Sequence, residues 1–348
     1  MLKKEDFICM TPFTYTEVFD NQQRLCCNNW LTEDNNIMLT DSIKDNYYSD
    51  KANDIRESIL DGSYSRCSET HCPKLAGLKN NVQPEDFIER TPENIKKTRE
   101  ETRISMVNFC FDRSCNLACP SCRVEFINVH GKEREEVEEK MRQVDEEINE
   151  EVESLYLSGT ADPFFSNSYR KFLMNLDPSR YPKLRDIHIH TNGNLWTEQF
   201  WGKLHKIHHL IKTSEISIDA ATKSTYDVVR RGGDWDKLME NLKFIVALPQ
   251  MKNFYFSMVV SDDNYKEMFD FHKLLKGIFD KHAPNADWAV FYNKLTDWGT
   301  YSSEVFKAKA VFEPEHELYG DFLNELAKIK PLKNKTTNFP ELGNKPAI

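Results

Sequence analysis

Three closely spaced cysteines are the residues of this chain best suited to chemistry. Cys115, Cys119 and Cys122 follow the pattern C-x3-C-x2-C, directly after an apolar run at Ile104–Phe111. Thiolates are soft donors that suit iron–sulfur clusters, and a loop with this spacing can wrap three corners of a cubane 4Fe-4S cluster. Three protein ligands leave one iron open, so a further molecule can bind there. The alternative is a zinc site with a distant fourth ligand.

The distribution of cysteines also favours metal binding over disulfides. The chain has nine cysteines, and none follows Cys122. A disulfide framework needs oxidising surroundings and usually an even number of cysteines. The first residues carry lysines without an apolar stretch behind them, so no secretory signal is expected. We therefore expect a cytoplasmic protein whose cysteines ligate metal.

From residue 103 onward, apolar runs alternate with segments of helical period, which predicts parallel βαβ units. The predicted fold class is α/β: a partial (β/α)6 parallel barrel, whose chemistry would sit at the C-terminal strand ends. A small cysteine-rich N-terminal module would precede it. The predicted strands are Ile104–Phe111, Val152–Leu157, Asp186–His190, Glu215–Ile218, Phe254–Val260 and Trp288–Tyr292. The predicted helices are Glu133–Glu151, Tyr169–Asn175, Thr197–Ile211, Asp236–Ala247, Tyr265–Phe279 and one near Glu315–Ile329.

The predicted strands end in polar motifs, and together with the triplet these resemble the radical S-adenosylmethionine superfamily. Leu157-Ser-Gly-Thr-Ala-Asp-Pro163 resembles that family's glycine-rich turn, and His190-Thr-Asn-Gly193 and Ser217-Ile-Asp219 resemble its T-N-G and S-x-D motifs. Three departures stand out. Ser121 replaces the usual aromatic residue before the third cysteine, Ala161 replaces a glycine, and Asp162 replaces a glutamate. The resemblance covers roughly residues 103 to 292.

The resemblance implies a set of cofactor contacts at these strand ends. Gly159, Thr160 and Asp162 would bind the methionine amino group. Ser217 and Asp219 would meet the ribose and carboxylate, Asn192 would join them, and Arg230 is the candidate for the methionine carboxylate. Two alternatives from the residues alone are a helix cap for Asp162 and a solvated helix end for Arg230.

The N-terminal cysteines are similar to the SPASM/Twitch auxiliary-cluster module of radical enzymes, although that module usually follows the barrel. The resemblance implies that Cys9, Cys26, Cys67 and Cys72 hold a second 4Fe-4S cluster, with Cys27 as the alternative to Cys26. A zinc knuckle is the competing interpretation. The expected domains are 1–95 for this module, 96–299 for the barrel, and 300–348 for a C-terminal helix with an extended tail from Pro331.

Cys110 is then left over at the end of the first barrel strand. Side chains alternate along a strand, so Met106, Asn108 and Cys110 share one face, and a buried asparagine favours the polar lumen. We expect Cys110 to point inward, where a thiol could donate a hydrogen atom to a substrate radical. The alternative is a small buried hydrophobic residue.

The resemblance implies an enzyme that reductively cleaves S-adenosylmethionine and abstracts hydrogen from a substrate. The substrate would be a peptide or protein side chain, undergoing oxidation, cross-linking or epimerisation; the alternative is a sugar or aminocyclitol. An electron donor such as flavodoxin or ferredoxin would be the partner. A formal net charge of -10 argues against a general nucleic-acid binder, and no apolar run suits a membrane span. A non-catalytic zinc-binding or electron-transfer protein remains the alternative of another class.

Overall fold

The computed structural model describes the chain except residues 1, 20–21, 28–29, 33–36, 39–41, 70, 80, 82, 158, 340–341 and 343–348. Two sheets run through the described residues, one of two strands and one of ten. The strands are β1 (Phe7–Cys9), β2 (Tyr15–Phe19), β3 (Gln22–Arg24), β4 (Ile37–Met38), β5 (Phe87–Glu89), β6 (Met106–Cys110), β7 (Ser154–Leu157), β8 (Asp186–Thr191), β9 (Ile211–Ser217), β10 (Asn253–Val260), β11 (Asp287–Lys294) and β12 (Lys335–Thr337).

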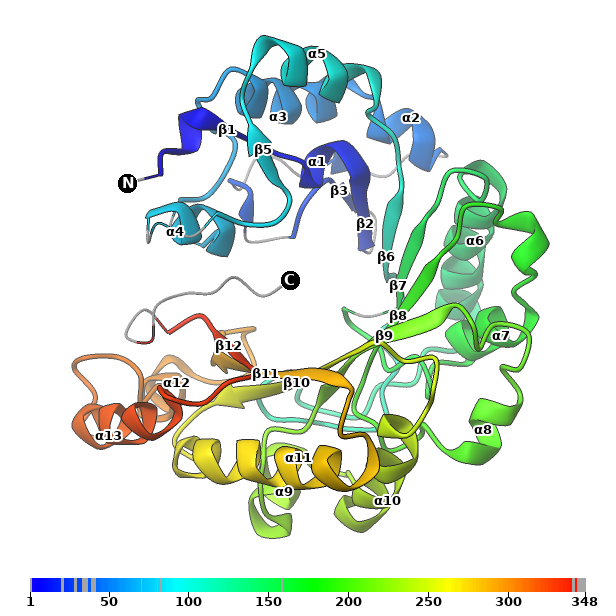
Figure 1. Ribbon diagram of the computed structural model, residues 1–348. Coiled ribbons are helices and arrows are strands. Elements are labelled where there is room, and N and C mark those ends of the chain that lie inside the picture. The colour runs from blue at the N-terminus through cyan, green and yellow to red at the C-terminus, as the bar shows by residue number, and fades with distance from the viewer. Residues whose placement is uncertain are drawn as a thin grey trace.

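Helices connect the parallel strands and cover the outer side of the large sheet (Figure 1). Many begin at a Ser, Thr or Asp whose side chain accepts from a backbone N–H of the first turn, as Ser166, Thr222 and Asp234 do. The helices are α1 (Thr11–Thr14), α2 (Ile43–Tyr47), α3 (Asp50–Leu60), α4 (Pro73–Lys79), α5 (Pro92–Glu100), α6 (Gly131–Glu147), α7 (Asn167–Asn175), α8 (Glu198–Gly202), α9 (Lys223–Val229), α10 (Trp235–Val246), α11 (Met268–His282), α12 (Ser303–Lys309) and α13 (Tyr319–Ile329). No described helix is both long and apolar enough to cross a membrane.

The large sheet confirms the predicted α/β fold class. Its order is β12-β11-β10-β9-β8-β7-β6-β2-β3-β4, and all neighbours from β12 to β2 pair in parallel. The six predicted strands are β6 to β11, in sequential order. The sheet curves into an open arc (Figure 1) whose edge strands are β12 and β4. The parallel barrel is therefore partial, as expected, but β2 and β12 extend it.

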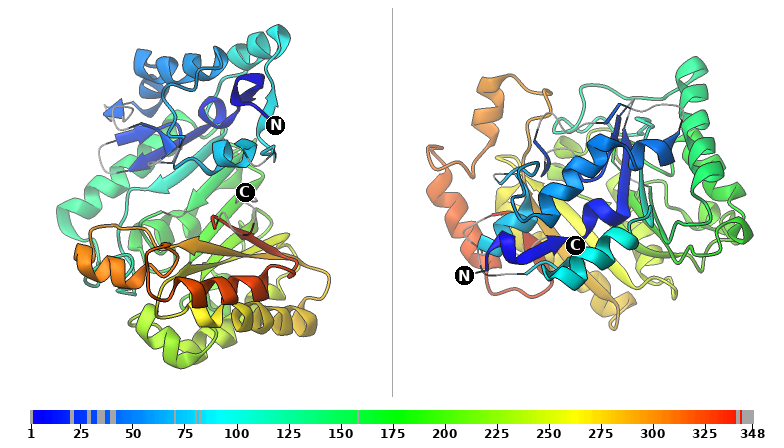
Figure 2. Two further views of the ribbon diagram at one scale, coloured as in Figure 1. Left: turned by 90° about the vertical axis from the view of Figure 1, so that its left-hand side faces the viewer. Right: turned by 90° about the horizontal axis from the view of Figure 1, so that it is seen from above.

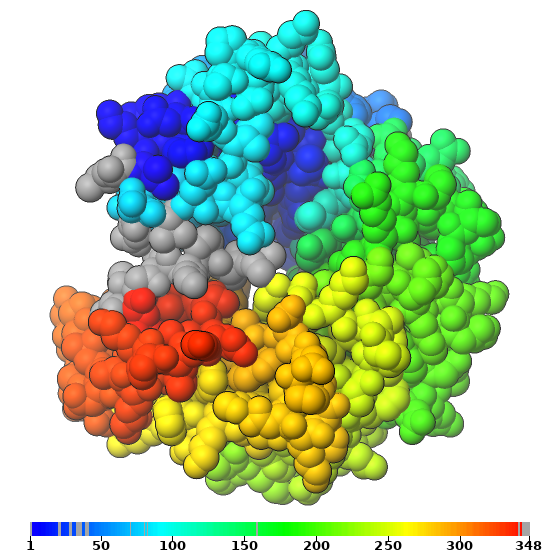
Figure 3. Space-filling model, in the orientation of Figure 1, coloured from blue at the N-terminus to red at the C-terminus, as the bar shows by residue number. Residues whose placement is uncertain are grey.

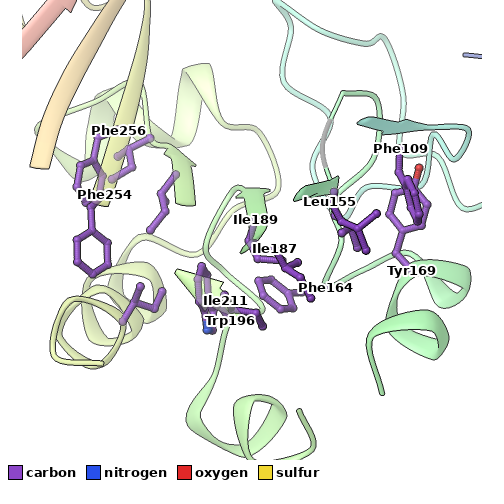
Figure 4. Close-up of a cluster of buried hydrophobic side chains, with 14 of the residues drawn as sticks. Phe109, Leu155, Phe164, Tyr169, Ile187, Ile189, Trp196, Ile211, Phe254 and Phe256 are labelled. Atoms are coloured by element: carbon purple, nitrogen blue, oxygen red, sulfur yellow. The ribbon is translucent and has the colours of Figure 1, made fainter. Parts of the chain in front are cut away.

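Strand alternation separates a packed outer face from a polar inner face. Leu155, Ile187, Ile189 and Phe254 are fully buried and belong to the core beneath the helices (Figure 4). The residues between them, such as His188, carry polar groups on the opposite face. The inner face of the arc is thus the side on which polar site residues can gather.

The N-terminal segment contributes strands directly to the barrel sheet. β2 pairs along its whole length with β6, from Tyr15 opposite Met106 to Phe19 opposite Cys110. Val18 is fully buried and belongs to the same core as the barrel. The sheet therefore continues across the domain boundary that we expected near residue 95. The remaining N-terminal elements, β1, β5, α3, α4 and α5, form a layer above the barrel (Figure 2).

One sequence expectation differs from the structure. The helix expected at Thr197–Ile211 ends at Gly202, and the chain continues through turns into β9, which begins at Ile211. The tail expected to be extended from Pro331 includes the short strand β12, which pairs with β11. The rest of that tail lies mostly outside the described residues.

Candidate active site

The cysteine triplet lies on the loop that leaves β6 at the C-terminal rim of the barrel. The Cys115 N–H donates to the Ile127 carbonyl at 2.9 Å, which closes the loop, and the Cys122 N–H donates to the Cys119 carbonyl at 2.9 Å. Cys119 is buried, Cys115 is half-buried and Cys122 is exposed. The loop therefore presents three thiols from one short segment.

One of two arginines at the triplet, Arg123, comes from the cysteine loop itself. Arg123 donates from Nη2 to the Thr160 carbonyl at 2.8 Å, and this nitrogen lies 3.5 Å from the Cys122 sulfur. Burial lowers the pKa of Arg123, but the Cys122, Cys115 and Cys119 thiols outweigh it and raise that pKa. Our sequence analysis missed Arg123, although its position directly after the third cysteine was a usable signal.

A second guanidinium reaches the triplet from the rim of β9. Arg230 Nε lies 2.8 Å from Asp219 Oδ2, and Arg230 Nη1 donates to the Cys119 sulfur at 3.7 Å. Asp219 Oδ1 accepts from the Val259 N–H at 2.8 Å, which ties the pair to β10. Asp219 adopts a φ of 61°, which residues other than glycine seldom tolerate, so these contacts must hold it there. Arg230 is thus buried against the site and not solvated.

The turn after β7 packs against Cys110. Gly159 has a φ of 86°, and a Cβ at this position would lie 2.2 Å from the Cys110 sulfur. The Thr160 hydroxyl donates to the Cys110 carbonyl at 3.2 Å. Only glycine satisfies both the backbone conformation and the close approach. The turn that the family resemblance assigns to methionine binding is therefore in contact with Cys110.

Cys110 lies on the inner face, as predicted from strand alternation. Phe109 packs outward on the α7 side chain Phe172, with ring centroids 5.2 Å apart. Asn108, on the opposite face, donates to Tyr15 Oη at 3.1 Å and to Glu17 Oε2 at 3.2 Å. Cys110 is buried, and burial together with the Glu17 carboxylate raises the pKa of its thiol. It is a neutral thiol in this setting.

Asp162 holds two strand ends together. Its Oδ2 accepts from the Thr191 hydroxyl at 2.7 Å and from the Asn192 N–H at 2.9 Å, and its Oδ1 accepts from the Phe164 N–H at 3.0 Å. Burial raises the pKa of this carboxyl, and the donors oppose that shift. Both oxygens are engaged within the protein. This geometry favours the cap that we considered for Asp162 over direct binding of an ammonium group.

Asn192 and Ser217 complete the rim. Asn192 Nδ2 donates to Asn116 Oδ1 at 2.9 Å and lies 3.8 Å from the Cys115 sulfur. The Ser217 hydroxyl lies 2.8 Å from the Ser257 hydroxyl and 3.0 Å from His190 Nε2. Asn192 therefore contacts the triplet loop directly, whereas Ser217 faces the lumen at the end of β9.

The four N-terminal cysteines that we expected to bind a second cluster gather where the two cores meet. Cys9 and Cys72 belong to the small N-terminal core, Cys26 belongs to the barrel core, and Cys67 packs against both. Burial raises the pKa of Cys9 to about 12, and that of Cys67 is raised by burial and by the Cys9 and Cys72 thiols. Three of these thiols are buried and one is half-buried.

The surroundings separate Cys26 from Cys27. Burial raises the pKa of Cys26, and Cys9 and Cys72 add to that shift. Cys27 is exposed, whereas Cys26 is buried, and Cys27 raises the pKa of both Cys26 and Cys110. These neighbours favour Cys26 as the fourth ligand.

The donors around the triplet suit an iron–sulfur cluster. Among the described residues, no three His, Cys, Asp or Glu side chains converge closely enough to hold one metal ion. A cubane binds each ligand at a separate iron, so its cysteines need not converge on one point. The triplet has Arg123 and Arg230 beside it, and these cations offset the charge that ligating thiolates carry. The residues at the rim therefore fit a cluster with three protein ligands.

Residues 109–275 match the model of the radical SAM superfamily. The match includes the cysteine triplet and the ends of β7, β8 and β9. This segment, just under half of the chain, is therefore similar to the radical SAM domain, whose members use a 4Fe-4S cluster and S-adenosylmethionine. No curated protein matches the sequence.

Several solved structures are similar at low identity. Streptococcus suis SuiB bound to precursor peptide SuiA has 15% identity and a TM-score of 0.44, over 84% of this chain and 63% of that chain. TYW1 with a lysine-pyruvate adduct has 14% identity and a TM-score of 0.38, over 65% of this chain and 70% of that one. A radical SAM methyltransferase from Sphaerobacter thermophilus has 13% identity and a TM-score of 0.34, over 65% and 63%. The chain thus spans less than two thirds of the SuiB chain.

Proposed function

We propose that this radical SAM enzyme abstracts hydrogen from a peptide or protein side chain, with Cys115, Cys119 and Cys122 holding the catalytic cluster. The observation that carries the cluster assignment is the convergence of Arg123, Arg230 and Asn192 on the three thiols. The cluster supplies the electron that cleaves S-adenosylmethionine to methionine and a 5′-deoxyadenosyl radical.

This chain's own residues bind and orient the cofactor at the rim. Gly159 and Thr160 offer backbone groups to the methionine portion, and Asp162 fixes that turn relative to the end of β8. Ser217 and Asp219 would lie beside the ribose of the cofactor. Arg230 is held by Asp219 beside Cys119, so it can meet the methionine carboxylate close to the open iron.

The substrate would enter the hollow inside the arc. Figure 3 shows the molecule hollowed between the cyan N-terminal residues and the green and yellow barrel residues, with blue N-terminal residues at its floor. Polar side chains on the inner face, such as Asn108, His190 and Glu17, offer hydrogen bonds to a polar substrate. The arc is open at its edge strands, which supports an extended substrate. A sugar or aminocyclitol is the alternative.

The proposed auxiliary cluster favours net oxidation. A cluster with four protein ligands, Cys9, Cys26, Cys67 and Cys72, can accept an electron but leaves no iron open for a cofactor. The test is the iron and sulfide content of a Cys67→Ala/Cys72→Ala variant reconstituted without oxygen. We expect it to lose about half of the wild-type iron and to retain some cofactor cleavage. An unchanged iron content would contradict the auxiliary site.

Cys110 offers a different outcome, in which a hydrogen atom returns to the substrate radical as in epimerisation. Its inward position beside Gly159 supports this possibility. With the true substrate, Cys110→Ala should then leave cofactor cleavage unchanged but lose or divert the product. Unchanged product and stereochemistry would leave Cys110 as packing and favour net oxidation.

Flavodoxin or ferredoxin is the proposed electron donor.

A further inference from the structure

Lys74 is a buried cation placed beside the four N-terminal cysteines. Its side chain is only 15% exposed. It forms an ion pair with Asp86 and donates to the Thr11 hydroxyl at 2.7 Å, while its ammonium lies 5.8 Å from the centre of the Trp30 ring. Cationic side chains are rarely buried unless they are paired. The low exposure of the Lys74 ammonium beside the cysteines therefore requires an explanation.

Lys74 and Asp86 connect to the cysteines through Thr11. The Thr11 hydroxyl donates to Asp86 Oδ2 at 2.5 Å and lies 3.6 Å from the Cys9 sulfur. The ammonium is also within electrostatic range of three of the four thiols: Cys9, Cys26 and Cys72. Lys4, which acts electrostatically on Cys67, pairs with Glu69 and is more exposed than Lys74. Lys74 is thus the principal buried cation at this site.

We propose that Lys74 and Asp86 set the reduction potential of the auxiliary cluster, Lys74 raising it and Asp86 lowering it. The inference rests on the proposed auxiliary cluster. Reduction adds one negative charge, and a nearby cation stabilises that state, whereas a nearby carboxylate disfavours it. The effect of a nearby charged side chain on the reduction potential is largest where water is excluded from the cluster.

The consequence concerns the net reaction. In net oxidation, the substrate radical gives one electron to the auxiliary cluster and loses one proton to solvent, which balances charge and atoms. A higher potential makes the cluster a better acceptor of that electron. Lys74 would therefore favour net oxidation through the auxiliary cluster. It would not assist a reaction in which a hydrogen atom returns to the substrate radical.

The test measures the potential of the auxiliary cluster alone. In a chain carrying Cys115→Ala, Cys119→Ala and Cys122→Ala, an EPR-monitored redox titration reports only that cluster. Lys74→Met should lower the potential by at least 59 mV, a tenfold change for a one-electron couple. Asp86→Asn should raise it, and Lys74→Arg should keep it near the starting value. Lys79→Met is the matched control, because Lys79 lies on the same helix but is exposed and paired with Glu69.

The opposite signs distinguish tuning from a structural role. An ion pair that only holds α4 in place would leave the potential unchanged, or shift it in the same direction in both variants, and either result would overturn the proposal. Absence of iron from the triple-alanine chain would instead refute the auxiliary cluster, and the role of Lys74 with it.

Discussion

Gly159 packs so closely against the Cys110 sulfur at the rim that no side chain fits at position 159. Gly159→Ala should destabilise the chain by about 2–5 kcal/mol, because the positive φ costs about 1–2 kcal/mol and the clash with the Cys110 sulfur costs about 1–3 kcal/mol. In a Cys110→Ala background the cost should fall by at least about 1 kcal/mol, since the clashing sulfur is gone. Urea unfolding of the four chains measures this coupling. Additive effects would contradict the contact.

His188 should make stability depend on pH. Burial lowers its pKa from 6.5 to about 4, so the unfolded chain binds more protons than the folded chain between these values. Its contribution is fully present above pH 6.5 and is lost as pH falls toward 4, by about 2 kcal/mol at pH 5. Unfolding free energies at pH 8 and pH 5 test this. His188→Gln should show a smaller loss, whereas the exposed His205→Gln should match wild type; equal losses in both variants would refute the assignment.

Sequence motifs identified which residues gather at the rim, but not the partner of each. Asn192 and Arg230 reach the triplet from motifs that were visible in the sequence. The two hydrogen bonds to Asp162 Oδ2 could not be read from the sequence, because their donors Thr191 and Asn192 come from the end of another strand. Arg123 was missed although it directly follows Cys122, and only its contact with the Thr160 carbonyl depends on the folded loop.

At the scale of single elements, the short helix α9 depends on one carboxylate. Glu267 accepts from the N–H groups of Ala221 and Thr222, at 2.6 and 3.2 Å, and from the Thr225 hydroxyl at 2.6 Å. Arg230 follows the end of α9. Glu267→Ala should therefore cost about 2–3 kcal/mol of stability, as expected for several bonds to a charged group, and weaken binding of S-adenosylmethionine.

Binding titrations and urea unfolding provide the measurements for Glu267. The control is Asp270→Ala, because Asp270 lies in the first turn of α11 but is exposed. It should change stability by no more than about 0.5 kcal/mol. Wild-type affinity and stability in Glu267→Ala would show that α9 is held without it.

Strands and helices were predicted correctly where the alternation of apolar and polar residues extended over a long stretch, and they were missed where it was short. β6 to β11 were predicted because apolar runs alternate with clear helical periods. β2 was missed, although Thr16 and Val18 alternate with lumen-facing neighbours, because five residues among many polar ones give a weak signal. The helix expected before β9 rested on the helical spacing of Leu204, Ile207 and Ile211. That stretch instead forms turns, because packing against the sheet outweighs the local helical preference.

At the scale of the whole molecule, β2 joins the N-terminal segment to the barrel sheet through its pairing with β6. The domain boundary that we expected near residue 95 separates these two paired strands. A chain of residues 96–348 would expose the edge of β6 and lose buried core residues such as Val18, Tyr47 and Ile55. An unpaired, apolar edge strand promotes aggregation. We expect this fragment to aggregate or to bind a hydrophobic dye without cooperative unfolding. A soluble monomer that unfolds cooperatively would instead support separate domains.

The relation of the N-terminal segment to the barrel could not be predicted, because strand partners distant in sequence leave no local pattern. The parallel pairing of β2 with β6 joins residues about ninety positions apart. The same pairing brings Glu17 beside Asn108. The connection between the N-terminal segment and the barrel is therefore a property of the folded molecule.

The central claim is that the triplet holds the cluster that cleaves S-adenosylmethionine. The direct measurement is 5′-deoxyadenosine formed after anaerobic reconstitution, with a chemical reductant and S-adenosylmethionine. The wild-type chain should form it, and the variant with Cys115, Cys119 and Cys122 all replaced by alanine should form none while keeping the iron of the auxiliary cluster. Formation of 5′-deoxyadenosine by the triple variant would contradict the assignment.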